Sequence, residues 1–420
     1  MQTSTWWTPS SVRDTLRAWV WAALTGSDVD PPPFPEHTAT RTALARWIRW
    51  HGLVQRVYPI VRGRPPTSEW AWLADALRGV YYRGVVWNLH LLETLRVVET
   101  FARSRSISWI HWKGLTLAVL AYGDTLARMP GDLDVWIPPE HPPEQLAEQL
   151  ATIGYRPLYV LSPSEWRLYR RAMHAIVFLH DTWCPLDVHW RWMPPDFQTR
   201  EMTVAVGATI PIRIPCATGD VTVQTLSPEW HFLYHMLHAA KHEWAKLLWT
   251  TDLAGIVYRH PALDWDLILR EIHRHRMVYI AGITLRLIRE WTDLPLPPEP
   301  RRLLETVPST AGVFRRVQRR ILDMRGEGPV WQRLALMWRI RESWRDRLRI
   351  LWGWWTTPMP ADLHAWRLPT VLHPLYPWLR PVRLVGKALV MTARAIGTAT
   401  SRRPGVSAGS IAERSPEPGV

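Results

Sequence analysis

The stretch WIHWKGLTLAVLAYGDTLARMPGDLDVWI, residues Trp109–Ile137, decides the fold. Ile107–Trp112 (ISWIHW) is short and alternates, which predicts a strand that begins just before this stretch. Gly114–Tyr122 (GLTLAVLAY) predicts a helix. Gly131–Ile137 (GDLDVWI) alternates again and predicts a second strand, which Pro138 brings to an end. The stretch therefore predicts a strand–helix–strand unit.

The residues that follow predict the rest of a compact core. Pro142–Ile153 has proline and glutamate in its first turn and predicts a helix. Ser162–Glu165 (SPSE) has the spacing of a capping box and predicts the start of another helix. Ala175–His180 and Pro185–Trp192 are two strand-like runs separated by a tight turn, which predicts a hairpin. This order of elements predicts the fold class α+β, with a small mixed β-sheet.

Helical patterns flank this core on both sides. Before it, apolar residues recur at steps of three and four, as in residues 43–61. After it, Ser227 and Pro228 predict the cap and first residue of a helix, and helical patterns continue to about residue 355. The last residues lack periodicity and are rich in glycine, proline and serine. We therefore expect an N-terminal helical region at residues 1–105, an α+β core at 106–225, a C-terminal helical region at 226–395 and a disordered tail at 396–420.

The basic charge of the chain has two open explanations. The formal net charge is +14, which fits a nucleic-acid or other polyanion partner. However, only four of the 51 basic residues are lysine, asparagine occurs once and tryptophan 29 times. This skew is typical of a GC-rich coding bias, in which arginine and tryptophan codons spread. The charge therefore leaves a nucleic-acid partner open without establishing one.

The remaining composition predicts a soluble cytoplasmic protein. The 420 residues are 47% hydrophobic and 21% charged, as in ordinary globular proteins. Two cysteines, Cys184 and Cys216, are too few for a disulfide framework or a thiolate-rich zinc site. The N-terminus does not have the pattern of a signal peptide, and no run reaches the roughly 18–20 apolar residues of a membrane span. We expect no transmembrane segment.

Asp132 and Asp134 are the centre of the expected chemistry. Residues two apart on a strand point to the same face, so the two carboxylates project together while Leu133 packs inward. Such carboxylates repel each other unless a cation lies between them, and oxygen ligands suit magnesium or manganese. Lys113 and Gly114 end the preceding strand, where a helix N-terminus can receive a phosphate. On its own, a D-x-D triplet is also compatible with a solvated edge strand.

These residues together resemble the uncharacterised nucleotidyltransferase family of the polymerase-β-like superfamily. In that family a strand ends in lysine–glycine, a helix ends in tyrosine, and an arginine precedes the D-x-D strand. The matching positions are Lys113, Gly114, Tyr122, Arg128, Asp132 and Asp134. Asp187-Val188-His189 matches the third carboxylate of the family, on a neighbouring strand. Leu115 stands where the wider superfamily has serine.

The resemblance implies a metal-dependent nucleotidyltransferase. Asp132, Asp134 and Asp187 are expected to be the catalytic residues and to bind Mg²⁺ or Mn²⁺. Lys113, Gly114 and Arg128 are expected to contact the phosphates of a nucleoside triphosphate. The reaction moves a nucleoside monophosphate to a hydroxyl acceptor, which we expect to be a small molecule, and releases pyrophosphate. Two alternatives remain: an RNA or protein acceptor, or an inactive binding or scaffold protein with this fold.

The helix expected after the sheet carries a stripe of histidines. His231, His235, His238 and His242 fall on one helical face, and the last two frame Lys241 in the H-x-x-K-H element of the resemblance. The stripe is too long to hold one tetrahedral zinc ion. Candidates for the acceptor pocket or cleft are His189, His238, Lys241 and His242. Histidines that bond to carbonyls in the core are the other explanation of the stripe.

The segment Trp331–Trp352 (WQRLALMWRIRESWRDRLRILW) mixes arginine with tryptophan, leucine and isoleucine. Such a helix can lie on an acidic membrane surface or bind RNA by stacking. More often it packs one side against the core and exposes a solvated side. We favour this packed arrangement and do not expect peripheral membrane contact.

Overall fold

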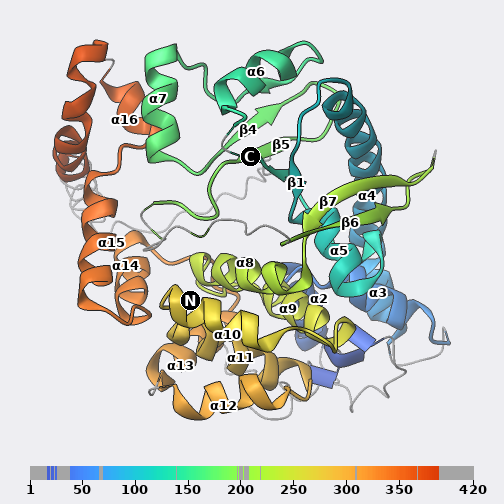
Figure 1. Ribbon diagram of the computed structural model, residues 1–420. Coiled ribbons are helices and arrows are strands. Elements are labelled where there is room, and N and C mark those ends of the chain that lie inside the picture. Colours follow the sequence, from blue (N-terminus) through green and yellow to red (C-terminus); the bar gives the residue numbers. More distant parts are fainter. Residues whose placement is uncertain are drawn as a thin grey trace, which may run out of the picture.

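The computed structural model describes residues 17–18, 20–22, 24–25, 38–65, 70–138, 140–195, 197, 202, 208–217, 219–307, 310–366 and 368–386. Within them the chain forms a mixed α+β fold with one seven-stranded sheet, which confirms the expected fold class (Figure 1). The expected disordered tail, residues 396–420, lies outside the described residues. None of the helices that the structure describes is long and apolar enough to cross a membrane.

The sheet is mixed and its strands are short. The strand order is β3-β4-β5-β2-β1-β7-β6. The pairs β2–β5 and β1–β7 are parallel, and the other four pairs are antiparallel. The strands are β1 (Ile110–His111), β2 (Leu133–Trp136), β3 (Arg156–Pro157), β4 (Ala175–Leu179), β5 (Leu186–His189), β6 (Thr209–Ile214) and β7 (Val221–Leu226).

The deciding stretch forms the expected strand, helix and strand, but the second strand is shorter than expected, so Asp132 lies just before β2 and not in it. The helix α5 spans Gly114–Tyr122, as expected, and Gly123 ends it in the left-handed conformation. The strand expected at Ile107–Trp112 is reduced to the two residues of β1. The expected hairpin is β4–β5, and the capping box of Ser162 and Glu165 is present at the start of α7.

Three strands were not predicted. The strand β3 has only two residues, too few to show a period. The hairpin β6–β7 adds two strands beside β1, and β7 alternates buried and exposed residues at its start. One expected contact is also wrong: Ser227 lies at the cap position of α8, but its side chain donates to Glu229 and bonds no backbone amide. The carboxylate of Glu229 binds the Ser227 hydroxyl in place of a backbone amide of the helix.

The helices lie before, within and after the sheet. Those before and within it are α2 (Thr38–Trp50), α3 (Val54–Arg62), α4 (Ala71–Ser104), α5, α6 (Pro143–Ala151), the 3₁₀ turn η1 (Thr125–Ala127) and α7 (Pro163–Ala172). Those after it are α8 (Pro228–Lys241), α9 (Leu247–Arg259), α10 (Trp265–Arg274), α11 (Val278–Thr292), α12 (Pro298–Thr306), α13 (Ala311–Leu322), α14 (Val330–Arg339), α15 (Trp344–Thr356), α16 (Pro360–Ala365) and η2 (Thr370–Leu375).

The expected single helix Trp331–Trp352 is in fact two helices. The helix α14 ends at Arg339, and α15 begins at Trp344 after Ser343, whose side chain accepts a hydrogen bond from the amide of Arg345. A serine that caps a new helix offers the backbone an alternative to continuing the old one. The chain thus forms two separate helices here, and α14 and α15 contact each other.

Two apolar cores meet at the sheet. One joins α4, α6, α7 and α16 to the strands, and the other joins α2 and α3 to the helices α8–α15. Figure 1 shows α6 and α7 on one side of the sheet and the α8–α13 layer on the other. The helix α5 contributes side chains to both cores, for example Leu115 and Leu117. It therefore fixes the position of its own first residue, next to Lys113.

Candidate active site

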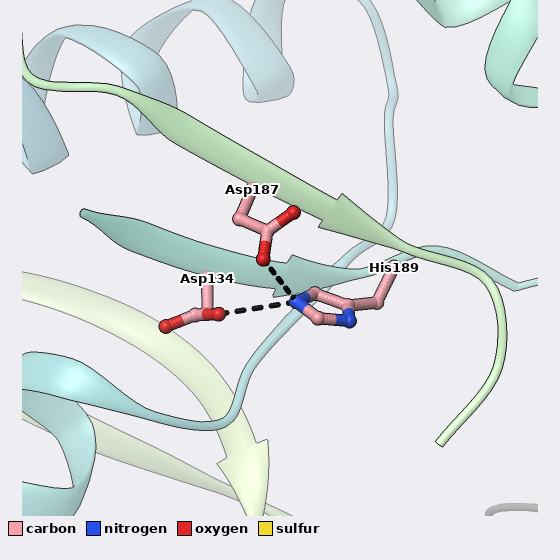
Figure 2. A group of neighbouring side chains, drawn as sticks. All are labelled: Asp134, Asp187 and His189. Atoms are coloured by element: carbon pink, nitrogen blue, oxygen red, sulfur yellow. Dashed lines mark hydrogen bonds and ion pairs between the residues drawn. The ribbon is translucent and has the colours of Figure 1, made fainter. Parts of the chain in front are cut away.

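Two aspartates and a histidine lie together where β2 and β5 run side by side (Figure 2). Asp134 and Asp187 are partners in the parallel register of these strands. The Nε2 atom of His189 lies 3.1 Å from Oδ1 of Asp134 and 2.9 Å from Oδ2 of Asp187. One ligand atom from each residue lies within 4.8 Å of the others. The family resemblance implied that Asp187 lies on a strand next to that of Asp134, and the structure brings the two together.

The charge of Lys113 completes this cluster. Lys113 is extended at the cap position of α5, and Gly114 follows with φ of 55°, a conformation that glycine adopts without strain. The ammonium Nζ lies 2.6 Å from Oδ1 of Asp134 and 3.2 Å from Nε2 of His189. The tautomer of His189 determines the role of Nε2: with a proton it donates to the two carboxylates, and without one it accepts from Lys113 and can bind a metal.

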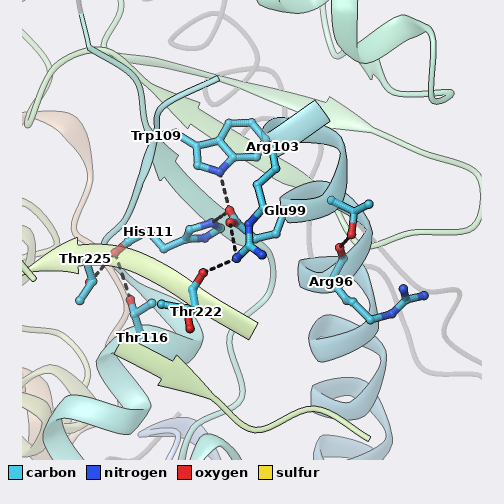
Figure 3. Close-up of polar contacts among 9 residues, drawn as sticks. Arg96, Glu99, Arg103, Trp109, His111, Thr116, Thr222 and Thr225 are labelled. Carbon is cyan, nitrogen blue, oxygen red and sulfur yellow. Dashed lines mark hydrogen bonds and ion pairs between the residues drawn. The ribbon is translucent and has the colours of Figure 1, made fainter. Parts of the chain in front are cut away.

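A buried glutamate on α4 anchors the strand that leads to Lys113 (Figure 3). Oε1 of Glu99 accepts hydrogen bonds from Nε1 of Trp109 at 2.6 Å and from Nε2 of His111 at 2.7 Å. Arg103 lies beside the same carboxylate, at 3.9 Å, and donates to the backbone of Thr222 in β7. This network ties α4, β1 and β7 together and was not predicted from the sequence.

Two threonines hold the turn between β1 and α5 (Figure 3). The hydroxyl of Thr225 donates to the carbonyl of His111 and lies 2.8 Å from Nε2 of His231. The hydroxyl of Thr116 donates to the carbonyl of Lys113 at 2.9 Å. The carbonyls on both sides of Trp112 therefore have fixed partners, which sets the direction in which Lys113 projects.

The three carboxyl groups titrate differently because their neighbours differ. The charge of Asp134, followed by burial and the charge of Asp187, raises the pKa of Asp132 to about 7. Burial opposes ionisation of Asp134, but Lys113 and His189 hold its pKa well below the usual range. Burial likewise opposes ionisation of Asp187, and His189 nevertheless lowers its pKa. In turn, burial alone would lower the pKa of Lys113, but Asp134 keeps it raised.

The residues present fit a divalent cation. Within the described part of the chain, Oδ2 of Asp134, Oδ1 of Asp187 and both oxygens of Asp132 accept no hydrogen bond from the protein. The raised pKa of Asp132 records a repulsion that a cation relieves. Carboxylate oxygens suit magnesium or manganese, and an imidazole nitrogen such as that of His189 is accepted by manganese.

Arg128 was expected to contact phosphate, and the structure places it beneath the turn instead. Its guanidinium lies 3.0 Å from Oδ1 of Asp252 and donates to the carbonyl of Gly114 at 3.3 Å. The hydroxyl of Tyr122 donates to the same Asp252 oxygen at 2.7 Å, and the guanidinium of Arg56 lies 3.7 Å from the centre of the Tyr122 ring. Two positions of the family resemblance, Arg128 and Tyr122, therefore meet at the buried Asp252, and Arg128 also supports Gly114.

The histidine stripe on α8 divides into two parts. Nδ1 of His235 lies 2.9 Å from the carbonyl of His231, and both residues are buried. They are core histidines, which was one of the two explanations open. His238 and His242 are half-buried, their rings lie 4.7 Å apart, and His242 pairs with Glu327. Among the described residues no metal-binding group lies on this helix.

Lys241 and His174 lie near the carboxylates, although only Lys241 was a candidate. Burial, then the charge of Lys113, lowers the pKa of Lys241 to about 8, whereas Asp187 raises it. In the described part of the chain the Lys241 ammonium has no hydrogen-bond or ion-pair partner. The ring of His174 lies 5.7 Å from that of His189. His174 lies between α7 and β4, and no pattern in the sequence around it indicated that it would lie near the carboxylates.

The fold and this carboxylate cluster define a protein of the nucleotidyltransferase type. The chain belongs to the uncharacterised nucleotidyltransferase family, whose model matches residues 38–293. That match includes Lys113, all three aspartates and the H-x-x-K-H element of α8. No curated protein is similar enough to the chain to count as a match.

Two solved structures share a distant likeness with the chain. The antibiotic-resistance factor ANT(2'')-Ia is 17% identical and has a TM-score of 0.30; the match covers 44% of this chain and 91% of that one. An antigenic nucleotidyltransferase-like protein from Paracoccidioides brasiliensis is 14% identical with a TM-score of 0.28, over 54% of this chain and 97% of that one. At these TM-scores neither likeness says anything about the substrates of this chain.

Proposed function

We propose that this protein is a divalent-metal-dependent nucleotidyltransferase that moves a nucleoside monophosphate from a nucleoside triphosphate to a hydroxyl group of a small molecule. The observation that supports this most directly is the pairing of Asp134 and Asp187 in register, with the Lys113 ammonium 2.6 Å from Asp134. Acidic groups that face each other on adjacent strands, next to a glycine turn at a helix start, suit a metal-bound triphosphate.

Each group has a part in the transfer. A bound divalent metal supplies charge neutralisation for the triphosphate and activates the acceptor hydroxyl. Asp132, which lies just before β2, Asp134 in β2 and Asp187 in β5 would hold this metal. The acceptor oxygen bonds to the α-phosphorus while the bond to the bridging oxygen breaks and pyrophosphate leaves with that electron pair. We assign the hydroxyl proton to Asp187, the carboxylate on the acceptor side.

Two lysines contribute positive charge for the phosphates. Lys113 is already bound to Asp134, so it holds the carboxylate and remains charged. Lys241 lies where both Asp187 and Asp134 influence its pKa, and it is free of partners among the described residues. A half-buried amine without a counter-ion is stabilised when a phosphate binds beside it. We therefore assign Lys241 to the triphosphate.

An apolar groove beside the D-x-D strand supports a place for the nucleoside. The groove has a volume of about 900 Å³ and is lined by Tyr82, Val86 and Trp87 of α4 and by Pro130 and Gly131. Nε1 of Trp87 donates to the carbonyl of Pro130, whose ring also lies against Gly114. Pro130 therefore contacts both the groove and the turn at Gly114, where we place the phosphates. The aromatic rings of the groove can stack on a base.

Thermal unfolding with each nucleotide tests this proposal. The melting temperature is measured with ATP, CTP, GTP and UTP, each with and without magnesium, because a ligand that binds only the folded state raises it. The wild type is compared with Asp132→Asn combined with Asp134→Asn, and with Asp181→Asn as a control. The side chain of Asp181 is 82% exposed in the turn after β4.

We expect a magnesium-dependent rise with at least one triphosphate in the wild type and in Asp181→Asn, and none in the double variant. That triphosphate names the donor. A rise that the double variant retains, or no rise with any triphosphate, contradicts the catalytic assignment and favours the scaffold alternative.

A further inference from the structure

The outer face of α15 is apolar and exposed. Trp344, Leu348, Trp352 and Trp355 are 64%, 49%, 60% and 39% exposed. They follow one another at steps of four, four and three, so they form a single stripe along the helix. Such a contiguous apolar surface on a water-soluble fold marks a site of contact with something else. The sequence led us to expect that the apolar side of this segment packs against the core, but this stripe is exposed.

Neighbouring residues extend this surface beyond one helix. The ring of Trp378 is 65% exposed and meets that of Trp352 at 6.4 Å between centres. Leu334 of α14 lines a groove of about 780 Å³ together with the exposed residues of α15. Trp331, at the start of α14, is 67% exposed. We call the four stripe residues with Trp378 the tryptophan face.

The exposed charged residues of this helix pair are all arginines. Residues 330–356 contain six arginines and two acidic residues, which gives a net charge of +4. Both acids are used on the inner side: Asp346 is buried and pairs with Arg276, and Glu342 accepts the amide of Val278. Arg345 and Arg349 are exposed at the flank of the stripe, and the guanidinium of Arg349 also lies 3.9 Å from Asp346. The outward surface is therefore apolar and cationic.

We propose that the tryptophan face is a docking surface for an anionic phospholipid bilayer. Tryptophan and leucine on one face of a helix bury their side chains at the boundary between headgroups and acyl chains, where tryptophan is favoured. Arginines at the edge of such a face meet the negative headgroups. The helix α15, with 13 residues, lies along the surface and does not cross it.

The same observations disfavour two other partners. A second copy of the chain, docked face to face about a two-fold axis, brings Arg345 and Arg349 against the same arginines of its partner. A single-stranded RNA stacks on aromatic rings, but Leu348 in the middle of the stripe and Leu334 in the groove offer it no such contact.

Sedimentation of the full chain with vesicles tests the proposal. Two vesicle types are used: phosphatidylcholine alone, and phosphatidylcholine mixed with an equal part of phosphatidylglycerol. The variants are Trp344→Ser with Trp352→Ser, and Arg345→Gln with Arg349→Gln. The control is Leu158→Ser with Val160→Ser, two exposed apolar residues outside the tryptophan face, 47% and 92% exposed. All substituted side chains are exposed, so the melting temperatures should stay equal.

We expect the wild type and the control to sediment with the mixed vesicles at least tenfold more strongly than with phosphatidylcholine. The tryptophan variant should lose this binding, and the arginine variant should lose its preference for the anionic lipid. Equal sedimentation of wild type and tryptophan variant overturns the proposal. It is also overturned if the tryptophan variant keeps vesicle binding but loses binding to a labelled single-stranded RNA, or changes from dimer to monomer in light scattering.

Discussion

The ammonium of Lys113 lies 2.6 Å from Oδ1 of Asp134, so the protein itself places a cation on the carboxylate cluster. Lys113 is nearly enclosed, with 13% of its side chain exposed, and Asp134 has 6%. A buried charge pair of this kind keeps each partner ionised. In the absence of metal it offsets part of the repulsion among the three aspartates. Under the proposed function, a metal and a triphosphate would enter a site whose geometry Lys113 already maintains.

Replacing Lys113 should make the protein depend on metal for its stability. In Lys113→Met the carboxylate of Asp134 loses its counter-ion, and breaking a buried pair costs roughly 3–5 kcal/mol. We expect a lower melting temperature without metal, and a larger rise on adding Mn²⁺ than in the wild type, because the repulsion among the aspartates is then unrelieved. Differential scanning fluorimetry measures both. The control Lys246→Met, at an exposed lysine, should behave as wild type. Equal Mn²⁺ responses in all three proteins would refute the assignment.

Metal affinity should rise with pH up to neutrality. The pKa of Asp132 is raised to about 7 by Asp134 and burial, so below pH 7 a proton occupies the carboxylate. Metal binding must displace that proton, and the apparent affinity therefore falls up to tenfold for each unit below pH 7. Titration calorimetry with Mn²⁺ between pH 5.5 and 8 measures this. In Asp132→Asn the slope should vanish over this range. A wild-type affinity independent of pH would show that Asp132 is not a ligand.

Local sequence patterns determined the elements that carry the site. The alternation in Gly131–Ile137 and in Pro185–Trp192 predicted that Asp134 and Asp187 lie on strands. Because side chains alternate along a strand, each carboxylate was also expected on a defined face of the sheet. The helix Gly114–Tyr122 was predicted with its correct ends because glycine marks both of them: Gly114 is its first residue and Gly123 follows its last. These features depend on residues close in the chain.

Contacts between distant segments were not predictable in the same way. Arg128 had the position of a phosphate ligand, but Asp252, more than a hundred residues later, lies 3.0 Å from its guanidinium. Glu99 bonds His111 only because α4 passes beside β1. The outer face of α15 has the same composition as a packed stripe, and only the position of the neighbouring helices leaves Trp352 exposed.

The network of Glu99 should affect the position of Lys113 as well as stability. In Glu99→Gln the amide oxygen can still accept from Trp109 and His111, but it carries no negative charge, and the amide NH2 replaces the oxygen that faces Arg103. Hydrogen bonds to a charged acceptor are stronger than those to a neutral one, so we expect a cost of about 1–3 kcal/mol. We expect a lower melting temperature and a weaker magnesium-dependent nucleotide shift. Glu93→Gln on the same helix breaks only an exposed pair with Arg96 and should change neither. Matching behaviour of the two variants would exclude a positioning role for Glu99.

The apolar groove at α4 should determine nucleoside affinity. Val86 is 67% exposed at the groove, so Val86→Asp adds a charge there without disturbing the core. The added carboxylate disfavours a stacked base and repels the triphosphate, and we expect the concentration of nucleotide needed for half of the thermal shift to rise about tenfold. Leu89→Asp, on the same helix, 51% exposed and outside the groove lining, is the control. An unchanged nucleotide response in Val86→Asp would place the nucleoside elsewhere.

His51 should make the fold sensitive to acid. Its Nε2 lies 2.9 Å from the carbonyl of Ile321, and its Nδ1 accepts the amide of Leu247 at 3.0 Å. The neutral ring with a proton on Nε2 satisfies both contacts. Burial, opposed in part by the bond to Ile321, lowers the pKa of His51 from 6.5 to about 3.

Because the unfolded chain binds this proton below pH 6.5 and the folded chain does not, stability is full above pH 6.5. It falls by about 1.4 kcal/mol per unit as the pH drops towards 3. In His51→Gln the amide can still donate and accept, but it does not titrate. Chemical denaturation at pH 7.5 and 5 should therefore show a smaller loss of unfolding free energy in the variant, by roughly 2 kcal/mol. Equal losses in the two proteins would mean that His51 is protonated in the folded state as well.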